Sequence, residues 1–401
     1  MKDLVAIPNG WQQLTVGAVL RHTQYGLSLP AAADGDVPIV GMKDLVDGMV
    51  RENNLARVKI ESEQAKRFLL HEGDLLINRT NSPDLVGKVG YVGRPIHAVF
   101  ASYLVRLAPD ITIINPKFLA NWLASGLGQQ QIEPLITRGV SQANINPASL
   151  CRHVRISVPP LSEQQGIAEI LGTWEGAVSC ARRLKENSER LYTSAASTMI
   201  CLRGGNMLAL RKVLLPDRMK AVLPVGPFRA LGVRSHGKGT FSRIDDLDAI
   251  GSIKTVYRVE PNRFIVNIVF AWEGAAAITS PEDEGCLVSH RFPAFSIDAE
   301  LLDLEYLRHM IRTKPFRQLL ALASPGGAGR NKTLNREDLL RFEVHLPSLE
   351  EQRRIAATLT TLDKRIVNLG QYLERLVKQR DALATELLSG RRRVNVPAPV
   401  G

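Results

Sequence analysis

Cysteine is scarce in this chain of 401 residues, with four copies at Cys151, Cys180, Cys201 and Cys286. No two of them form a CxxC pair, and no histidine stands at metal-ligand spacing from any of them, so no metal site is expected. The opening MKDLVAIPNGW lacks the apolar stretch of a signal peptide, and no apolar run reaches the ~18 residues that span a bilayer. We therefore expect a cytoplasmic protein without a membrane partner.

Signatures of catalysis are also missing. The sequence has no GxSxG elbow, no HExxH, no full dinucleotide glycine fingerprint and no Asn-Pro-Pro-aromatic signature of amino-methyltransferases. Residues 232–239, GVRSHGKG, come near the phosphate-binding pattern GxxxxGK but lack the Ser or Thr that would bind Mg²⁺. We interpret this segment as a basic loop, and we expect a chain that binds rather than catalyses and that holds no cofactor of its own.

Positive charge is in excess, with 51 Lys and Arg against 40 Asp and Glu and a formal net charge of +11. Such a surplus favours a polyanionic partner, most commonly nucleic acid, although a basic but otherwise ordinary surface would give the same count. A chain of this length is too long for one ordinary core, so two or more domains are expected.

The most informative feature is an internal repeat. Residues 159–171, PPLSEQQGIAEIL, return 188 residues later as PSLEEQRRIAATL at 347–359, without a gap. A repeat of nearly half the chain length predicts two tandem copies of one architecture. Before each copy, apolar residues alternate with polar ones, at Val154, Ile156 and Val158 and again at Phe342, Val344 and Leu346, which predicts a half-buried strand.

Each copy of the repeat opens a heptad pattern that predicts a long helix, and two matched stripes in one chain predict an antiparallel coiled coil. An alternative is that each helix packs only on its own domain. The predicted seam comprises Ile167, Leu171, Trp174 and Val178 in the first helix and Ile355, Leu359, Leu362, Ile366, Leu369, Leu373 and Leu376 in the second. Lys185 and Ser188 interrupt the first stripe where the second carries Leu373 and Leu376. We interpret this polar pair as a register constraint or a point where another subunit intrudes.

The segments outside the helices are predicted to be mixed α/β domains. Short strands are expected at 37–40, 75–78, 89–92 and 102–107, a helix at 116–127, a continuous buried strand at 263–272 and a helical region at 301–322 that breaks near Pro315. The predicted fold is α+β, with two pseudo-symmetric mixed domains separated by the two helices. The expected divisions are domain 1 at 1–158, helix 1 at 159–203, domain 2 at 204–346, helix 2 at 347–390 and a basic tail at 391–401.

Loops rich in Arg, Lys, Asn and Gln are the candidate binding residues, because Arg and Lys suit guanine edges and phosphates while Asn and Gln suit adenine edges. The first domain offers Arg79, Thr80, Asn81, Ser82, Lys88, Arg138, Gln142, Asn144 and Asn146. The second domain offers Arg234, His236, Lys238, Arg243, Arg330, Asn331, Lys332 and Arg336.

These repeats resemble the specificity subunits of type I restriction–modification systems. The resemblance rests on PLSEQxxIA and PSLEEQxxIA at the heads of the helices and extends more loosely to HEGDLLINRT at 71–80, RSHGKGTF at 234–241 and AWEGAAAI at 271–278. It departs at Trp174-Glu175-Gly176, where the second copy has Leu362-Asp363-Lys364.

The resemblance implies that each domain reads one half of a bipartite site in double-stranded DNA and that the helices set the spacer. It implies two modification subunits as partners, which hold S-adenosylmethionine, and restriction subunits that use ATP and Mg²⁺ in systems that have them. Two alternatives stay open: a type IIB-like or methylation-only complex, and a coiled-coil scaffold that binds protein.

Overall fold

The computed structural model describes residues 7–82, 85–139, 142–200, 205–222, 224–245, 255–326 and 332–394. The chain forms two compact units, of which the first joins Met1–Ala181 to Tyr372–Gly401 and the second comprises Arg182–Gln371. These units do not follow the five consecutive segments set out from the sequence. Each takes in part of both long helices, because the seam side chains pack into the core of the unit beside them.

The first unit is built on a six-stranded sheet of order β2-β11-β7-β9-β5-β4. Its strands are β2 Leu20–Tyr25, β11 Leu104–Pro109, β7 Leu75–Asn78, β9 Val89–Tyr91, β5 Met49–Val50 and β4 Leu45–Val46. Smaller sheets are β10-β3-β6 (Val99–Phe100, Val37–Val40, Ala56–Val58), β12-β13-β8 (Ile136–Arg138, Ala143–Ile145, Thr80–Asn81) and β1-β14 (Gln12–Thr15, Arg155–Val158). The helical elements are η1 Val16–Val19, η2 Met42–Asp44, α1 Ser62–Phe68, α2 Pro116–Ala124, α3 Gly126–Ile132, η3 Glu133–Leu135 and α4 Pro147–His153.

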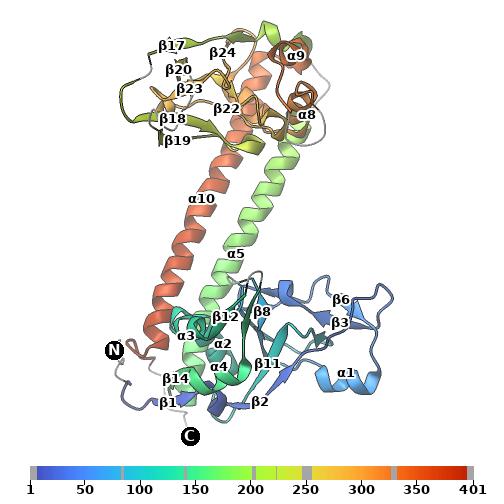
Figure 1. Ribbon diagram of the computed structural model, residues 1–401, viewed down its shortest axis with the longest axis vertical. Coiled ribbons are helices and arrows are strands. Elements are labelled where there is room, and N and C mark those ends of the chain that lie inside the picture. The colour runs from blue at the N-terminus through green and yellow to red at the C-terminus, as the bar shows by residue number, and fades with distance from the viewer. Residues whose placement is uncertain are drawn as a thin grey trace. The chain divides into compact units, whose positions relative to one another are not determined.

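The second unit has a five-stranded and a four-stranded sheet (Figure 1). The first has the order β17-β20-β23-β18-β19 (Met219–Ala221, Val256–Arg258, Leu287–Ser289, Phe228–Val233, Thr240–Asp245) and the other β16-β24-β21-β22 (Leu214–Pro216, Ala294–Ile297, Phe264–Val266, Ala276–Ile278). Strands β15 Asn206–Ala209 and β25 Glu343–Leu346 form a pair. The helical elements are η4 Leu210–Lys212, η5 Ser235–Gly237, η6 Ala271–Glu273, η7 Pro281–Asp283, α7 Leu304–Met310, α8 Lys314–Leu322 and α9 Arg336–Arg341.

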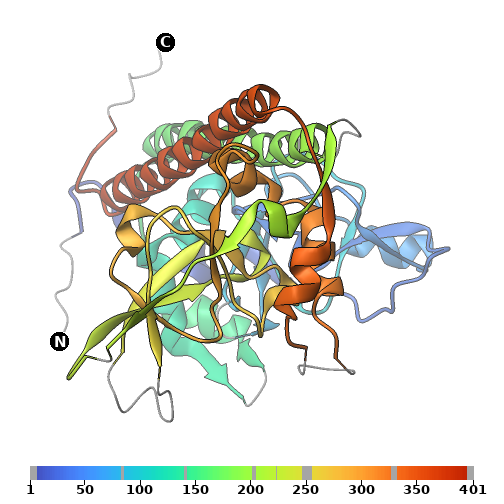
Figure 2. The same cartoon turned by 90° about the horizontal axis from the view of Figure 1, so that it is seen from above.

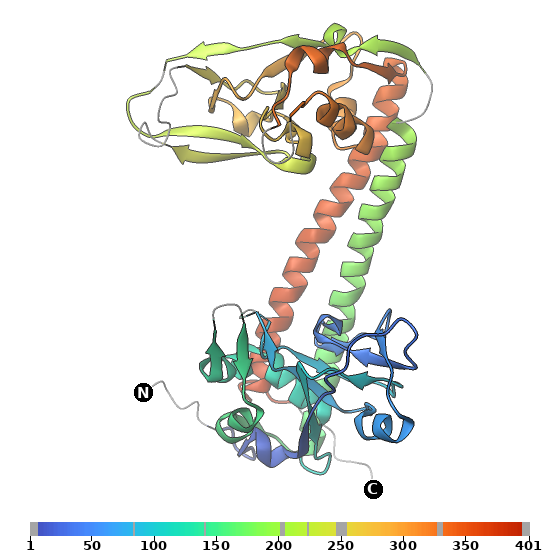
Figure 3. The ribbon, with the colours of Figure 1, turned by 45° about the vertical axis from the view of Figure 1, so that its right-hand side comes forward.

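The long helices are α5 Leu161–Ile200 and α10 Leu349–Leu388, which run side by side in Figure 3. Both start two residues later than predicted, because prolines at 159 and 347 precede them. In the first unit Val178 and Ala181 pack with Leu376, and in the second Tyr192 and Ile200 share a core with Ile355. Low numbers in α5 thus meet high numbers in α10, which confirms the α+β fold with an antiparallel helix pair.

The pairing corrects one detail of the predicted seam. Leu373 and Leu376 pack near Trp174, Val178 and Ala181 rather than filling the polar interval of α5. Ser188 is buried and donates its hydroxyl to Leu184 O at 2.8 Å, and Lys185 forms an ion pair with Glu189 at 2.5 Å. The side chain of Lys185 also passes Gly370, where a Cβ would lie 3.6 Å from its Cε.

Two predicted elements are shorter than expected. The helix predicted at 116–127 ends at Ala124, because Ser125 turns outward and its side chain caps α3 by accepting from Gly128 N. The strand predicted at 263–272 ends at Val266, because the side chain of Asn267 accepts from Val269 N and bends the chain toward η6. The break predicted near Pro315 is confirmed, since Thr313 caps α8 by accepting from Phe316 N.

No helix within the described ranges is long and apolar enough to cross a membrane.

Candidate nucleic-acid interface

A repeated glutamine fixes each domain to the long helix that follows it. Gln164 accepts from Asn115 N at 2.6 Å and donates to Ile113 O at 3.1 Å and Pro159 O at 2.8 Å. Gln352 makes the same three contacts 188 residues later, with Asp303 N at 2.8 Å and with Leu301 O and Pro347 O at 2.9 Å each. Both side chains are buried. The repeated Gln therefore holds the N-terminus of α2 or α7 against the start of its helix.

A polar network adds to this attachment in the second unit. His309 is buried, and its ring nitrogens lie 2.9 Å from the Tyr192 hydroxyl and 2.9 Å from the Thr360 hydroxyl. Arg312 donates to both carboxylate oxygens of Asp363, at 2.9 and 3.0 Å. Burial, aided by the Arg312 charge, lowers the pKa of His309 to about 4, so the ring is neutral at physiological pH. The network joins α7 to both long helices.

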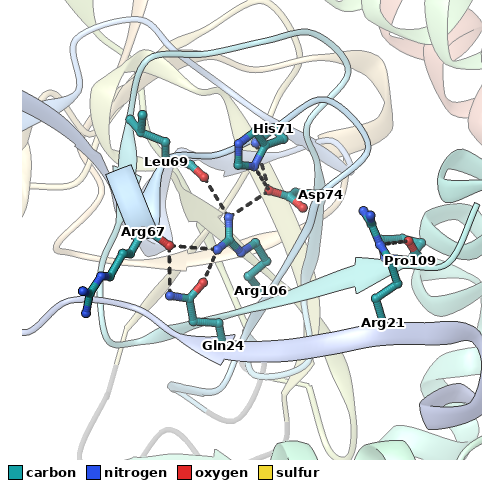
Figure 4. Close-up of polar contacts among 8 residues, drawn as sticks. All are labelled: Arg21, Gln24, Arg67, Leu69, His71, Asp74, Arg106 and Pro109. Atoms are coloured by element: carbon teal, nitrogen blue, oxygen red, sulfur yellow. Dashed lines mark hydrogen bonds and ion pairs between the residues drawn. The ribbon is translucent and has the colours of Figure 1, made fainter. Parts of the chain in front are cut away.

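In the first unit, a buried arginine organises the turn before β7 (Figure 4). Arg106 donates to Leu69 O at 2.7 Å, to Arg67 O at 3.2 Å and to Asp74 Oδ2 at 3.2 Å. The same Asp74 oxygen accepts from His71 N at 2.9 Å, so the Asp of the HEGD segment closes its own turn. Strand β7 starts at the next residue, so this cluster fixes the start of β7 and thereby the position of Asn78 at its end.

In both domains the chain leaves the sheet at the end of a buried strand, and a backbone hydrogen bond holds it just beyond that strand. Strand β7 ends at Asn78 and is followed by Arg79, whose carbonyl accepts from Ile145 N at 2.9 Å. Strand β21 ends just before Asn267, and the carbonyl of Ile268 accepts from Leu334 N at 2.9 Å. Residues 79–82 and 268–270 therefore hold equivalent places.

The first domain gathers most of its predicted residues there. The sheet β12-β13-β8 aligns Thr80 with Asn144, and the Thr80 hydroxyl donates to Asn144 Oδ1 at 2.6 Å. Arg138 lies at the end of β12 and forms an exposed ion pair with Glu133 at 3.3 Å. Asn81 lies in β8 of the same sheet, where it pairs with Ala143, and Gln142 directly precedes β13. We call this surface, with Arg79 and Ser82, the first reading face.

Two predicted residues of the first domain have other surroundings. Asn146 caps α4, where its side-chain oxygen accepts from Ala148 N at 2.9 Å. Lys88 is exposed, and its carbonyl accepts from Asn78 N at 2.8 Å, which places it beside the end of β7 and directly before β9.

Two exposed tyrosines extend the first reading face and were missed from the sequence. The Arg79 guanidinium lies over the Tyr25 ring, 5.0 Å from its centre, and Arg79 N donates to Tyr103 O at 2.9 Å. Tyr25 and Tyr103 are 51% and 49% exposed, which leaves their rings open to a partner. Tyr25 is the last residue of β2 and Tyr103 directly precedes β11. Nothing in the sequence distinguishes a tyrosine at such a position from one in the core.

In the second domain the predicted basic loop is the turn of the β18–β19 hairpin, which Figure 2 shows in yellow-green. Arg234 donates to Thr240 O across the turn and lies over the Phe241 ring, 5.0 Å from its centre. His236 has a positive φ of 63° inside the turn, Lys238 is exposed, and Arg243 pairs with Asp245 at 2.9 Å.

Element η6 connects this turn to a further predicted residue. Gly237 N donates to Gly274 O at 2.9 Å, and Lys332 lies over the Trp272 ring, 5.3 Å from its centre. We call the hairpin, η6 and Lys332 the second reading face. Arg330 and Asn331 fall outside the described residues. Arg336 lies elsewhere, at the start of α9, where its charge adds to burial in lowering the pKa of Arg218.

A cleft of about 670 Å³ opens on the second reading face. It is lined by both strands of the hairpin, by residues 267–273 and by Leu287–Phe292. No group of three or more His, Cys, Asp or Glu side chains in the described ranges could hold a metal ion. The chemistry on offer is thus aromatic stacking, hydrogen bonding and positive charge, which are the means of nucleic-acid recognition.

Comparison with known proteins agrees with these features. The family described as "Type I restriction modification DNA specificity domain" matches residues 8–186 and 240–376. A protein designated, provisionally, the MjaX specificity subunit of a type I restriction enzyme from Methanocaldococcus jannaschii is 23% identical, over 98% of this chain and 96% of its own. The EcoKI specificity subunit of Escherichia coli is 26% identical over 42% of this chain and 36% of that protein.

A solved structure shares the fold. The crystal structure of the S subunit of a type I restriction–modification system from M. genitalium superposes with a TM-score of 0.59 at 15% identity, covering 97% of this chain and 98% of that one. Two matched domains, their doubled helix motif and this shared fold lead to one conclusion. The chain belongs to the family of type I restriction–modification DNA specificity domains.

Proposed function

We propose that this chain reads a bipartite site in double-stranded DNA, one half through each reading face, and that α5 and α10 set the length of the unread spacer. The observation that carries the proposal is the repeated attachment of both domains through Gln164 and Gln352. Two readers fixed in the same way to a shared helix pair would present their faces at a set separation, which fits half-sites at a fixed distance.

The chemistry is assigned to partners. Two modification subunits would dock on the helices, hold S-adenosylmethionine and methylate adenine, and restriction subunits would use ATP and Mg²⁺. This chain supplies recognition and binds none of these groups itself. Its net charge of +11 suits the phosphate contacts that position a protein on a duplex.

The spacer role is tested by lengthening both helices together. Seven residues inserted after Arg182 and seven after Gln371 preserve the heptad register, and at 1.5 Å per residue they add about 10 Å, or roughly three base pairs. Mapping of methylated adenines in host DNA gives the site before and after the change. We expect both half-sites to be kept and the spacer to change, and an unchanged spacer would refute the role of the helices.

Reading of sequence is tested by binding. The assembled complex should bind a duplex carrying both half-sites far more tightly than a scrambled one, with affinity falling steeply as salt rises. Equal binding of all duplexes would contradict recognition, and an absence of salt-dependent binding would favour the protein-binding scaffold. The identity of the co-purifying chains separates a type I system from a type IIB-like or methylation-only complex.

A further inference from the structure

The cleft on the second reading face has aromatic walls. Four phenylalanines line it: Phe228, Phe241, Phe270 and Phe292. Phe270 is 46% exposed and its ring is open to a partner, whereas Phe241 is 36% exposed and carries the Arg234 guanidinium over its ring. A volume of about 670 Å³ lies within the roughly 300–1,000 Å³ of pockets that hold small organic groups.

The hollow is built by the sequence of the hairpin. The register pairs Phe228 with Asp245, Ala230 with Arg243 and Gly232 with Phe241, and because side chains alternate along a strand these six share the face that lines the cleft. The small Ala230 and Gly232 lie between larger neighbours. A Cβ on Gly232 would come within 2.3 Å of the Phe241 ring, so the ring lies directly on the glycine backbone.

The charged side chains that line the cleft are two arginines, Arg243 and Arg291, and two carboxylates, Asp245 and Glu273. Arg243 and Arg291 are exposed, and the Arg243 partner Asp245 lies at 2.9 Å. Glu273 is engaged as well, because it accepts from the Ser235 hydroxyl at 2.8 Å. An occupant with flat apolar faces and a polar edge that accepts from guanidinium groups fits this lining, and a nucleobase has those features.

The position of the cleft supports the same occupant. Its lining includes Asn267, Val269 and Phe270, which follow the buried strand β21. The equivalent residues of the first domain are those after β7, where Thr80 and Asn144 form the first reading face. At this place the first domain has hydrogen-bonding side chains beside two exposed tyrosines, and the second has a cleft lined by four phenylalanines, so the two domains would read their half-sites by different means.

We propose that this cleft receives a base of the second half-site that has left the duplex stack, with one face against Phe270, the Phe241 ring beside it and its edge toward Arg243 and Arg291. The inference rests on the proposed reading of DNA and adds where and how one base is recognised. Stacking on an aromatic ring is insensitive to which base is present, so the arginines would supply the preference.

The test uses the assembled complex and duplexes in which 2-aminopurine replaces single bases of the mapped second half-site. We expect binding to raise the fluorescence at one position other than the methylated base, since methyltransferases extrude their own target. Ala230→Leu fills the hollow and should remove that increase, and Phe270→Leu, at an exposed position, should weaken binding of this duplex about tenfold. Ser242→Leu, which adds the same bulk to the other face of the hairpin, is the matched control.

The outcomes separate this inference from the proposed function. Two results would refute the proposed role of the cleft while the proposed reading of DNA stands. One is specific binding without a fluorescence increase in the second half-site, and the other is an increase that Ala230→Leu and Phe270→Leu leave unchanged. If the wild-type complex shows no specific binding to DNA, the proposed function itself is refuted. An increase that disappears in Ala230→Leu and persists in Ser242→Leu supports the cleft.

Discussion

Replacing either repeated glutamine by alanine should detach one domain from its helix and leave the other domain unaffected. Gln164→Ala removes the contacts of α2 in the first unit, and Gln352→Ala removes the equivalent contacts of α7 in the second. The two side chains are 0% and 1% exposed, so water does not readily replace them.

The expected magnitude follows from the three hydrogen bonds that each glutamine makes. A buried backbone group that loses its partner costs about 1–3 kcal/mol. Because three groups lose a partner together and such losses are not fully additive, we expect a total loss of about 2–5 kcal/mol in the free energy of unfolding of the affected unit.

Hydrogen exchange of the full chain, resolved along the sequence, is the assay. Gln164→Ala should accelerate exchange around Asn115 and α2, and Gln352→Ala around Asp303 and α7. Ser162→Ala and Glu350→Ala are matched controls, because both positions are exposed and stand two residues before the glutamines. The reasoning is refuted if the glutamine variants exchange like these controls, or if each variant loosens both units equally.

Three other outcomes are expected. The pKa of His309 falls from 6.5 to about 4 on folding, so between these pH values the unfolded chain binds more protons than the folded one. The free energy of unfolding of the second unit should therefore fall by about 2 kcal/mol as the pH drops from 7 to 5. Urea titrations at a series of pH values measure this dependence, which His309→Gln should flatten. Arg393→Ala removes both guanidinium contacts to the buried Glu163, at 2.7 and 2.9 Å, and should lower the thermal midpoint of the first unit while the second unit keeps its own. Lys185→Leu combined with Ser188→Leu should disturb assembly or the spacer length if the polar interval sets helix register, and a variant with both unchanged would count against that role.

The repeat allowed much of the fold to be predicted. Period and spacing alone indicated two copies, two long helices and the strand before each helix, because hydrophobic periodicity over 40 residues is a strong signal. The break before α8 was also foreseen, since proline excludes a continuous helix there.

Elements set by single side-chain contacts were harder to predict. Asn267 ends a strand whose apolar run continues to Trp272, and Ser125 starts a new helix within an apparently continuous one. Each depends on one side chain accepting from a nearby backbone amide, which competes with regular structure and leaves no periodic trace.

The candidate binding residues stay a prediction, although the structure brings several of them together. Thr80 and Asn144 were chosen for their polar chemistry, and the structure joins them across 64 residues of sequence. We did not select Tyr25, Tyr103 or Phe270 as candidate binding residues, because the exposure of an aromatic ring depends on strands that are distant in the sequence. The function of Gln164 was likewise hidden, since its partners Ile113 and Asn115 lie about 50 residues before it.

The first unit needs both ends of the chain. Arg393 donates to Asn9 O at 2.9 Å and lies over the Trp11 ring, and Leu387 and Leu388 complete the core around Trp11. On the ribosome, residues 182–371 are all available before that closure can occur. The domain whose synthesis begins first is therefore the last to be finished, and a premature stop codon near position 385 should impair reading of the half-site assigned to the N-terminal domain.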